Sequence, residues 1–462
     1  SSDLILHREK GARNSCCAPR EEAGVKMEVE ADHSAVVIDN GTGFTKLGYA
    51  GNTEPSFVFP TSIATRNESK TVASRRTGLE DLDFVVGEQA RELSQKGTHD
   101  MVNPMKAGQV ENWDHMERIW EQCFFKYLRC EPEEQYVMLT EPPMNAPENR
   151  EYTAEIMFET FNVKGLHIAV QAVLALCASW EQGMKDGEHF PDTGTVIDSG
   201  DGVTHIIPVV DGYVIGSAIK HVPLAGRSIT DFILQLIKER EHVPPEDGVY
   251  IAQQIKERFG YICKDLPSEF AKLDIPGPPS KQKKVPTFWD TLLPASGQRV
   301  SFEVGHEAFL GPELFFSPEI FSTQFSTPLS AMVDSTIQAC PIDCRKKLYQ
   351  NVVLSGGSTM FPNFGRRLKR DISQLVEARI RTNLTNLNFR EDIREAEVQQ
   401  SLKDMGVNVV SHKRQRFAVW FGGAMLASMP QFERMVVSKA EYDEHGPSIC
   451  RKSKAIFSAL NM

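Results

Sequence analysis

The chain has 462 residues and a net charge of −11, with 41% apolar and 24% charged residues. This length predicts about two or three domains with a sizeable core, and the acidic balance argues against nucleic acid as the main partner because phosphate binding needs a basic face. Nine scattered cysteines without zinc spacing favour reduced thiols in a cytoplasmic protein, and we expect neither a signal peptide nor membrane insertion.

The first predicted element is a hairpin with a glycine turn. It follows residues 1–34, whose lack of hydrophobic periodicity predicts a disordered extension. A β-branched strand from Ala35 leads into Asp39-Asn40-Gly41-Thr42-Gly43, and residues 44–50 return as a second strand. Glycines let backbone N–H groups converge on an anion, and a hydrated Mg²⁺ would connect the Asp39 carboxylate to phosphate. The pattern therefore predicts a phosphate loop between two strands.

Lys46 lies three residues beyond the last turn glycine, near enough to bring its ammonium group to a phosphate. The alternatives are a solvated strand lysine and, for the whole motif, an ordinary hairpin. Residues 57–60 are expected to close this small sheet, and the polar stretch 65–77 is expected to form a surface loop.

The same order of strand, carboxylate and glycine turn recurs at 196–205, as Val-Ile-Asp198-Ser-Gly200-Asp201-Gly202-Val203-Thr-His205. Short glycine motifs have a high false-positive rate, but two copies in the same order are harder to dismiss. Two such loops facing each other would clamp phosphate, with a cation between Asp39 and Asp198. Beyond this turn, Asp211-Gly212 predicts a tight hairpin.

We predict five helices, the first from the helical spacing of its apolar residues and the second from Pro147 in its first turn. Asn112 is the expected cap of the first of them, and residues 136–140 and 351–354 are expected to be strands. The predicted helices are 113–128, 147–161, 226–240, 251–261 and 364–381. Residues 419–425 are expected to begin one more, closely packed helix.

Two parts of the chain carry polar residues with two interpretations, and a third has glycines directly after a predicted strand. Gln171, inside the apolar run 168–180, is either a hydrogen-bonded core amide or a group aimed at a catalytic water. Lys256 and Glu257 are either a solvated helical pair or part of a site. The glycines of Ser355-Gly356-Gly357-Ser358-Thr359 would let a flat ligand lie against bare backbone.

Two stretches are expected to be irregular. Residues 274–297 are rich in Pro, Lys and Ser and predict an exposed insertion. Residues 383–413 are polar and predict, in part, a surface loop.

The order of Asp-Asn-Gly-Thr-Gly, Asp-Ser-Gly-Asp-Gly, Ser-Gly-Gly-Ser-Thr and Trp-Phe-Gly-Gly resembles that of the actin superfamily, from about residue 35 to the end. Longer runs resemble an actin-related subunit of the actin-related protein 2/3 complex; they are Thr42 with 46–55, 139–143, 148–156, 309–313, 340–343 and 446–451. The resemblance implies an α/β actin-like ATPase fold, in which two similar α/β lobes enclose a nucleotide cleft and each carries a smaller inserted subdomain. The first lobe would be 35–172 with 415–462 (subdomain about 64–98), and the second 173–414 (subdomain about 225–320).

The resemblance also implies roles for individual residues. Asp39 and Asp198 would organise the water shell of Mg²⁺ or Ca²⁺, and Gln171 and His205, with Asp198, would position the water that attacks ATP. Phosphates would be held by Gly41, Thr42, Gly43, Lys46, Gly200, Asp201, Gly202 and Val203. The nucleoside would be held by Lys256, Glu257, Gly356, Gly357, Thr359, Met360, Phe361 and Arg416.

Some positions depart from the superfamily pattern. Arg416 stands where actin has a lysine, which keeps the charge while changing the geometry. Ala107 replaces a histidine near the phosphate exit, so we expect altered phosphate release. Residues 1–34 have no counterpart in the superfamily, and residues 274–297 diverge from its pattern.

The resemblance implies an ATP-binding nucleator subunit with slow hydrolysis rather than a turnover enzyme. The expected partners are a second actin-related protein, other subunits of the complex, actin and nucleation-promoting factors, in the cytoplasm at the actin-rich cortex with a nuclear pool. The alternatives are a small-molecule kinase, a chaperone-type ATPase on the same scaffold, and a nuclear actin-related protein of a chromatin-remodelling complex.

Overall fold

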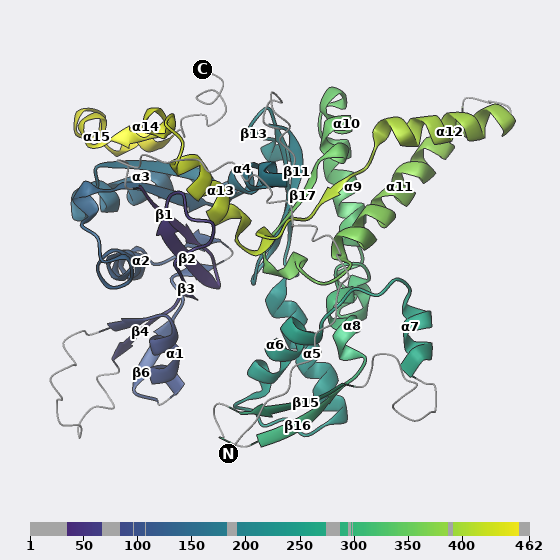
Figure 1. Ribbon diagram of the computed structural model, residues 1–462, viewed down its shortest axis with the longest axis horizontal. Helices are drawn as coiled ribbons and strands as arrows, with labels where there is room; N and C mark the ends of the chain where they lie inside the picture. Colours follow the sequence, from purple (N-terminus) through teal and green to yellow (C-terminus); the bar gives the residue numbers. More distant parts are fainter. Residues whose placement is uncertain are drawn as a thin grey trace, which may run out of the picture. The chain divides into compact units, whose positions relative to one another are not determined.

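Two antiparallel hairpins with glycine turns lie at the centres of two mixed sheets (Figure 1). The computed structural model describes residues 35–66, 84–95, 97–106, 108–182, 192–273, 287–293, 297, 299–386 and 391–451. All of them belong to one unit that spans 33–462. The predicted extension at 1–34 and the position of Ala107 lie outside the described residues.

The first sheet has six strands in the order β19-β10-β9-β1-β2-β3. Its centre is β1, which is buried along its whole length and pairs antiparallel with β2 and parallel with β9. The strands are β1 Ala35–Asn40, β2 Phe44–Tyr49, β3 Phe57–Pro60, β9 Tyr136–Glu141, β10 Gly165–Val170 and β19 Val437–Ser438. The predicted first hairpin, its closing strand and the strand at 136–140 are therefore confirmed.

The second sheet repeats this plan in the order β13-β12-β11-β17-β18, with β14 also paired to β12. Its centre is β11, antiparallel to β12 and parallel to β17. The strands are β11 Gly194–Ser199, β12 Thr204–Val210, β13 Tyr213–Val214, β14 Lys220–Val222, β17 Val352–Ser355 and β18 Val409–Val410. Asp211-Gly212 forms the predicted turn, with both residues at positive φ.

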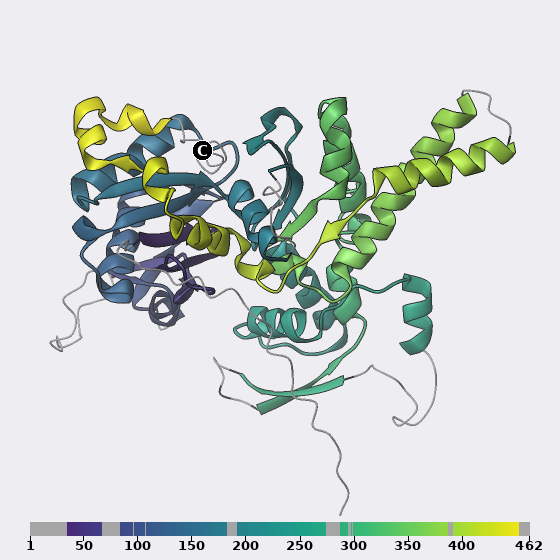
Figure 2. The same ribbon diagram turned by 45° about the horizontal axis from the view of Figure 1, so that its top comes forward.

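Two helices, α4 (Gln171–Ala178) and α13 (Ala418–Ala427), pack against each other between the two sheets (Figure 2). They share one apolar core with Val37 and Met138 of the first sheet and with Val196 of the second. Their backbones approach so closely that a Cβ atom added at Gly422 would lie 1.9 Å from the carbonyl oxygen of Leu174. Only glycine fits at this crossing.

A smaller three-stranded sheet with one helix follows the first hairpin. It comprises β4 Ile63–Arg66, β5 Phe84–Val86, β6 His99–Val102 and helix α1 Glu88–Gln95, and a short hairpin, β7 Met105–Lys106 and β8 Gln109–Val110, comes next. The surface loop expected at 65–77 is wrong at its start, because Thr65 and Arg66 pair with β6 as the end of β4. The rest of that stretch lies outside the described residues.

The predicted helices are confirmed, with two modifications near the first sheet. Asn112 caps α2 (Trp113–Glu121) by accepting a hydrogen bond from the His115 N–H, and the predicted segment continues as a π-helix over Gln122–Leu128. Helix α3 (Pro147–Glu155) likewise continues as a π-helix, Ile156–Thr160. At the C-terminal end the helices are α14 Phe432–Met435, α15 Lys439–His445 and a 3₁₀ turn, Pro447–Arg451.

The helices of the second half are α5 Gly226–Arg240, α6 Gly248–Phe259, α7 Leu266–Leu273, α8 Glu307–Glu313, α9 Leu329–Ala339, α10 Ile342–Gln350 and α11 Phe364–Asn386.

The prediction of an exposed insertion at 274–297 is wrong in part. Thr287–Leu292 forms strand β15, which pairs with β16 (Arg299–Val304), and Trp289 is buried against Phe302. The pairing partner follows the polar stretch, so local composition does not reveal the strand. Residues 274–286 lie outside the described part of the chain.

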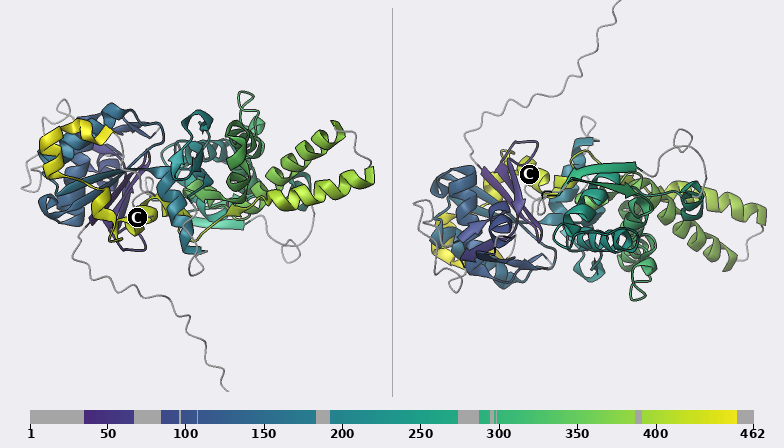
Figure 3. Two further views of the ribbon diagram at one scale, coloured as in Figure 1. Left: turned by 90° about the horizontal axis from the view of Figure 1, so that it is seen from above. Right: turned by 90° about the horizontal axis from the view of Figure 1, so that it is seen from below.

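The irregular segment expected at 383–413 is also corrected. Helix α11 continues to Asn386, α12 spans Glu391–Met405, and β18 joins the second sheet. Helix α12 lies beside α11 (Figure 3), with Val398 fully buried and Arg381 of α11 paired with Glu395 of α12. Leu402 and Met405 of α12 also pack against the apolar core, but most residues of this stretch are polar, so it shows little amphipathic periodicity. No helix of the described residues is long and apolar enough to span a bilayer.

Candidate nucleotide-binding site

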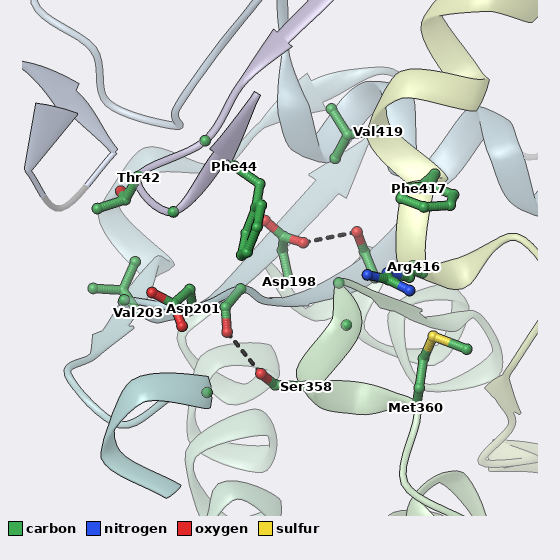
Figure 4. Close-up of a pocket in the computed structure, with 18 of the residues that line it drawn as sticks. Thr42, Phe44, Asp198, Asp201, Val203, Ser358, Met360, Arg416, Phe417 and Val419 are labelled. Atoms are coloured by element: carbon green, nitrogen blue, oxygen red, sulfur yellow. Dashed lines mark hydrogen bonds between the residues drawn. The ribbon is translucent and has the colours of Figure 1, made fainter. Parts of the chain in front are cut away.

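The two glycine turns meet across a cavity of about 580 Å³. A Cβ atom added at Gly43 would lie 2.9 Å from the Asp201 Cβ, and one added at Gly202 would lie 3.5 Å from the Thr42 side chain. In Figure 4, Thr42 and Phe44 face Asp201 and Val203 on one side of this cavity. The cavity has the size of a small-molecule site, roughly 300–1,000 Å³.

The two hairpins hold their carboxylates in the same way. Asp39 opposes Lys46 in the β1–β2 ladder, and Asp198 opposes His205 in the β11–β12 ladder. Thr140, at the end of the neighbouring parallel strand β9, donates its hydroxyl to Asp39 at 2.6 Å. Ser355, at the end of β17, donates to Asp198 at 2.7 Å (Figure 4). Each carboxylate is thus fixed at a strand tip by a hydroxyl from the next strand.

Burial and charge at these carboxylates favour a cation. Burial raises the pKa of Asp198 above its usual value, the Ser355 hydrogen bond and Lys46 lower it, and the nearby Asp39 raises it further. Lys46 Nζ lies 2.8 Å from Asp39 Oδ2 and compensates part of this charge. The described residues hold no group of three or more His, Cys, Asp or Glu that would form a metal cage. A hydrated ion that keeps several waters and contacts phosphate suits such a site.

Bare backbone lines much of the cavity. A Cβ atom added at Gly200 or at Gly357 would meet nothing within 4 Å, so each would project into open space. Gly356 adopts φ +90°, and a Cβ atom there would lie 2.1 Å from the carbonyl oxygen of Ser199. These glycines leave room for a ligand and bring the β17 turn against the second hairpin.

The start of α5 and one face of α6 form another wall. Lys256 donates to the Gly226 carbonyl at 3.0 Å and to Thr230 Oγ1 at 2.8 Å, and burial lowers its pKa. Glu257 accepts a hydrogen bond of 2.9 Å from Gln253, and both line the cavity. Ser358 donates to the Gly200 carbonyl at 2.7 Å (Figure 4) and ties the β17 turn to the second hairpin.

Met360, Arg416 and Phe417 lie at the far side of the cavity from the first glycine turn (Figure 4). The Arg416 guanidinium lies over the Phe417 ring, 5.3 Å from its centroid. A sulfur, an aromatic ring and a delocalised cation offer flat, polarizable surfaces to a ligand ring.

Gln171 and His205 both line the cavity. Gln171 Nε2 lies 3.3 Å from Asp39 Oδ1 and 3.4 Å from Thr140 Oγ1, so it hydrogen-bonds at the edge of the cavity rather than within the core. His205 is buried, and burial with the neighbouring His221 lowers its pKa to about 4. The imidazole is therefore neutral at neutral pH and can hydrogen-bond a water without adding charge.

Every site residue predicted from the sequence lines this cavity except Thr359. Thr359 is buried; its hydroxyl donates to the Gly356 carbonyl at 2.7 Å and accepts from Gln415 at 2.6 Å, so it holds the turn instead. Prediction from the sequence missed Phe44, Val58, Gly108, Gly226, Gln253, Gly260, Ser355, Ser358, Pro362, Phe417 and Val419. Ser355 and Ser358 flank the recognised glycines and could have been found there. Gly226 and Gly260 lie at helix ends with no local signal.

Comparison with known proteins agrees with this geometry. A family model described as actin matches residues 30–455. The chain therefore belongs to the actin family, whose α/β fold is the one predicted and whose members bind a nucleotide with a divalent cation. Within that family it is similar to proteins named actin-related protein 3. It is 55% identical to that of Dictyostelium discoideum, 54% to that of Acanthamoeba castellanii and 53% to that of Drosophila melanogaster. These matches cover 91%, 93% and 90% of this chain, and 97%, 98% and 96% of the relatives.

Proposed function

We propose that this chain is the ATP-binding actin-related subunit of an actin-related protein 2/3 complex, and that with a second actin-related subunit it templates new branches on actin filaments. The observation that carries this proposal is the similarity to actin-related protein 3 over about nine tenths of the chain. The partners are then the other subunits of the complex, actin and nucleation-promoting factors, in the cytoplasm at the cell cortex.

ATP would lie in the cavity with its phosphates between the two glycine turns. Gly41, Thr42 and Gly43 would hold them from one side, and residues 200–203 from the other, with Lys46 supplying positive charge. Asp39 and Asp198 would hold Mg²⁺ or Ca²⁺ through water. When bound, the cation neutralises charge on the phosphates. The nucleoside would contact Met360, Phe361, Arg416, Gly356 and Gly357, with Lys256 and Glu257 at the α6 wall.

The two hairpins belong to different sheets, so a nucleotide that contacts both favours the arrangement that brings the sheets together. A ligand shifts such a balance only by its difference in affinity for the two states. We therefore infer that ATP occupancy sets how the lobes 35–172 with 415–462 and 173–414 sit against each other. This would shape the surface that receives actin.

Slow hydrolysis is part of the proposal. Gln171 and His205 would hydrogen-bond the attacking water, and Asp198 would help to orient it. The neutral state of His205 suits this role, because the ring then offers one donor and one acceptor.

The test is purification of the tagged chain from its own cells, followed by assay of the purified material with actin. We expect a multi-subunit assembly that contains a second actin-related protein, binds Mg-ATP and accelerates actin polymerisation with branches. Recovery of the chain only as a free monomer, or of an assembly without effect on actin, would contradict the proposal.

A further inference from the structure

Four polar side chains stand in one row across the second sheet: Ser355, Asp198, His205 and His221. The strand register pairs Ser355 with Asp198, Asp198 with His205, and His205 with His221. Directly opposed residues on neighbouring strands place their side chains on the same face of the sheet. The row therefore runs from the cavity to the outer strand β14.

Hydrogen bonds join both ends of this row. Ser355 donates to Asp198 at 2.7 Å, and His221 Nδ1 lies 3.0 Å from His205 Nε2, so one of these two ring nitrogens donates a hydrogen bond to the other. The two imidazole rings have centroids 4.9 Å apart and are tilted by 57°. His205 is buried and lines the cavity, whereas His221 is exposed.

The first hairpin shows that the fold does not require a histidine at this place. Lys46, the counterpart of His205, is opposed on β3 by Val58, which forms no hydrogen bond with its side chain. The first hairpin therefore folds without a polar side chain on its outer strand, and the His221–His205 contact is specific to the second hairpin.

We propose that His221 is a positioning residue for His205, holding its ring so that a defined nitrogen faces the water beside the terminal phosphate. The proposal rests on the proposed function, which places that water at His205. A neutral imidazole has one donor and one acceptor, and the hydrogen bond made by one nitrogen decides what the other offers. His221 acts only through His205 and does not touch the ligand itself.

The experiment compares His221→Leu with His221→Asn in the assembly purified with the full chain. Leucine fills a similar space without a hydrogen bond, whereas asparagine offers both a donor and an acceptor near the place of Nδ1. Lys220→Ala is the matched control, because Lys220 is an exposed neighbour on the same strand that opposes Ile206 rather than His205. The probes are Mg-ADP alone and Mg-ADP with aluminium fluoride, which imitates the phosphate under attack by water.

In the wild type, aluminium fluoride should tighten Mg-ADP binding, because the site is complementary to the state under attack. In His221→Leu we expect the increase in affinity caused by aluminium fluoride to be about tenfold smaller, because a misplaced group loses much of its effect. The affinity for Mg-ADP alone should not change. Single-turnover ATP hydrolysis should slow by a similar factor. His221→Asn should restore most of both, and Lys220→Ala should match the wild type.

Three outcomes would overturn the proposal. If His221→Leu binds the fluoride complex as the wild type does, His221 does not position His205. If asparagine fails as leucine does, the ring serves packing rather than hydrogen bonding. If the wild type gains nothing from fluoride, no positioned water exists there. An assembly that binds no Mg-ADP at all would instead refute the proposed function, and this inference with it.

Discussion

The carboxylates of Asp39 and Asp198 occupy the same position in two hairpins of one design. Each lies one residue before the end of a central strand and accepts a hydroxyl hydrogen bond from the next parallel strand. Burial, with the charge of Asp39, raises the pKa of Asp198. Their cross-strand partners differ: Lys46 carries a charge, and His205 is neutral at neutral pH. The same hairpin structure, used twice, thus gives the cavity a cationic side at Lys46 and a neutral, hydrogen-bonding side at His205.

Replacing either carboxylate with its amide should weaken the binding of Mg-ATP. For Asp39→Asn and Asp198→Asn we expect losses of about 10- to 100-fold, the usual cost of removing a group that holds a metal through an intermediate ligand. Isothermal titration of the purified assembly measures this. In EDTA the same variants should bind ATP about as well as the wild type does, and an equal loss with and without the cation would contradict a metal-holding role.

Gly200→Ala should reduce nucleotide affinity without affecting folding. The added methyl group projects into open cavity space rather than against protein atoms, so it would take the place of a phosphate oxygen. We expect affinity for ATP to fall about tenfold or more, while the free energy of unfolding changes by less than about 0.5 kcal/mol. Gly216→Ala, which also meets nothing within 4 Å but lies outside the cavity lining, is the control. Equal affinities in the two variants would argue against a ligand at Gly200.

Gly422→Ala should instead destabilise the fold. Its added Cβ would meet the Leu174 backbone at 1.9 Å between the two sheets, and backbone cannot move aside as a side chain does. We expect a loss of about 1–3 kcal/mol in the free energy of unfolding. Urea denaturation of the variant beside Gly216→Ala measures the difference. A denaturation midpoint equal to that of the control would show that the helices can separate without cost.

The buried His205 should make stability depend on pH. Its folded pKa, about 4, lies below its ordinary value, so the unfolded chain binds the proton more readily. The stabilising contribution is complete above the unfolded pKa of about 6.5 and is lost as the pH falls toward 4. Between pH 7 and pH 5 we expect the free energy of unfolding to fall by about 2 kcal/mol more in the wild type than in His205→Gln. Urea unfolding at both pH values tests this, and identical pH slopes in wild type and variant would contradict it.

Prediction from the sequence succeeded where a local pattern carries its own physical cause. The Gly-rich turns, the Asn112 cap and the turn at Asp211-Gly212 each follow from backbone requirements of a few consecutive residues. It failed where the cause lies far along the chain. Strand β15 depends on its pairing with β16, and helix α12 depends on α11 as a neighbour. Thr359 shares its motif with cavity residues, yet its hydroxyl turns toward Gln415.

The sequence by itself determined that this chain has two glycine hairpins with a carboxylate at each strand tip, because φ preferences and strand alternation are properties of neighbouring residues. Only the tertiary structure decided that the two turns face each other across one cavity. It also decided that Gly226 and Gly260 join the cavity wall, and that His221 contacts His205. Those relationships come from the packing of two sheets around α4 and α13 and from the register between strands, which no short stretch of sequence encodes.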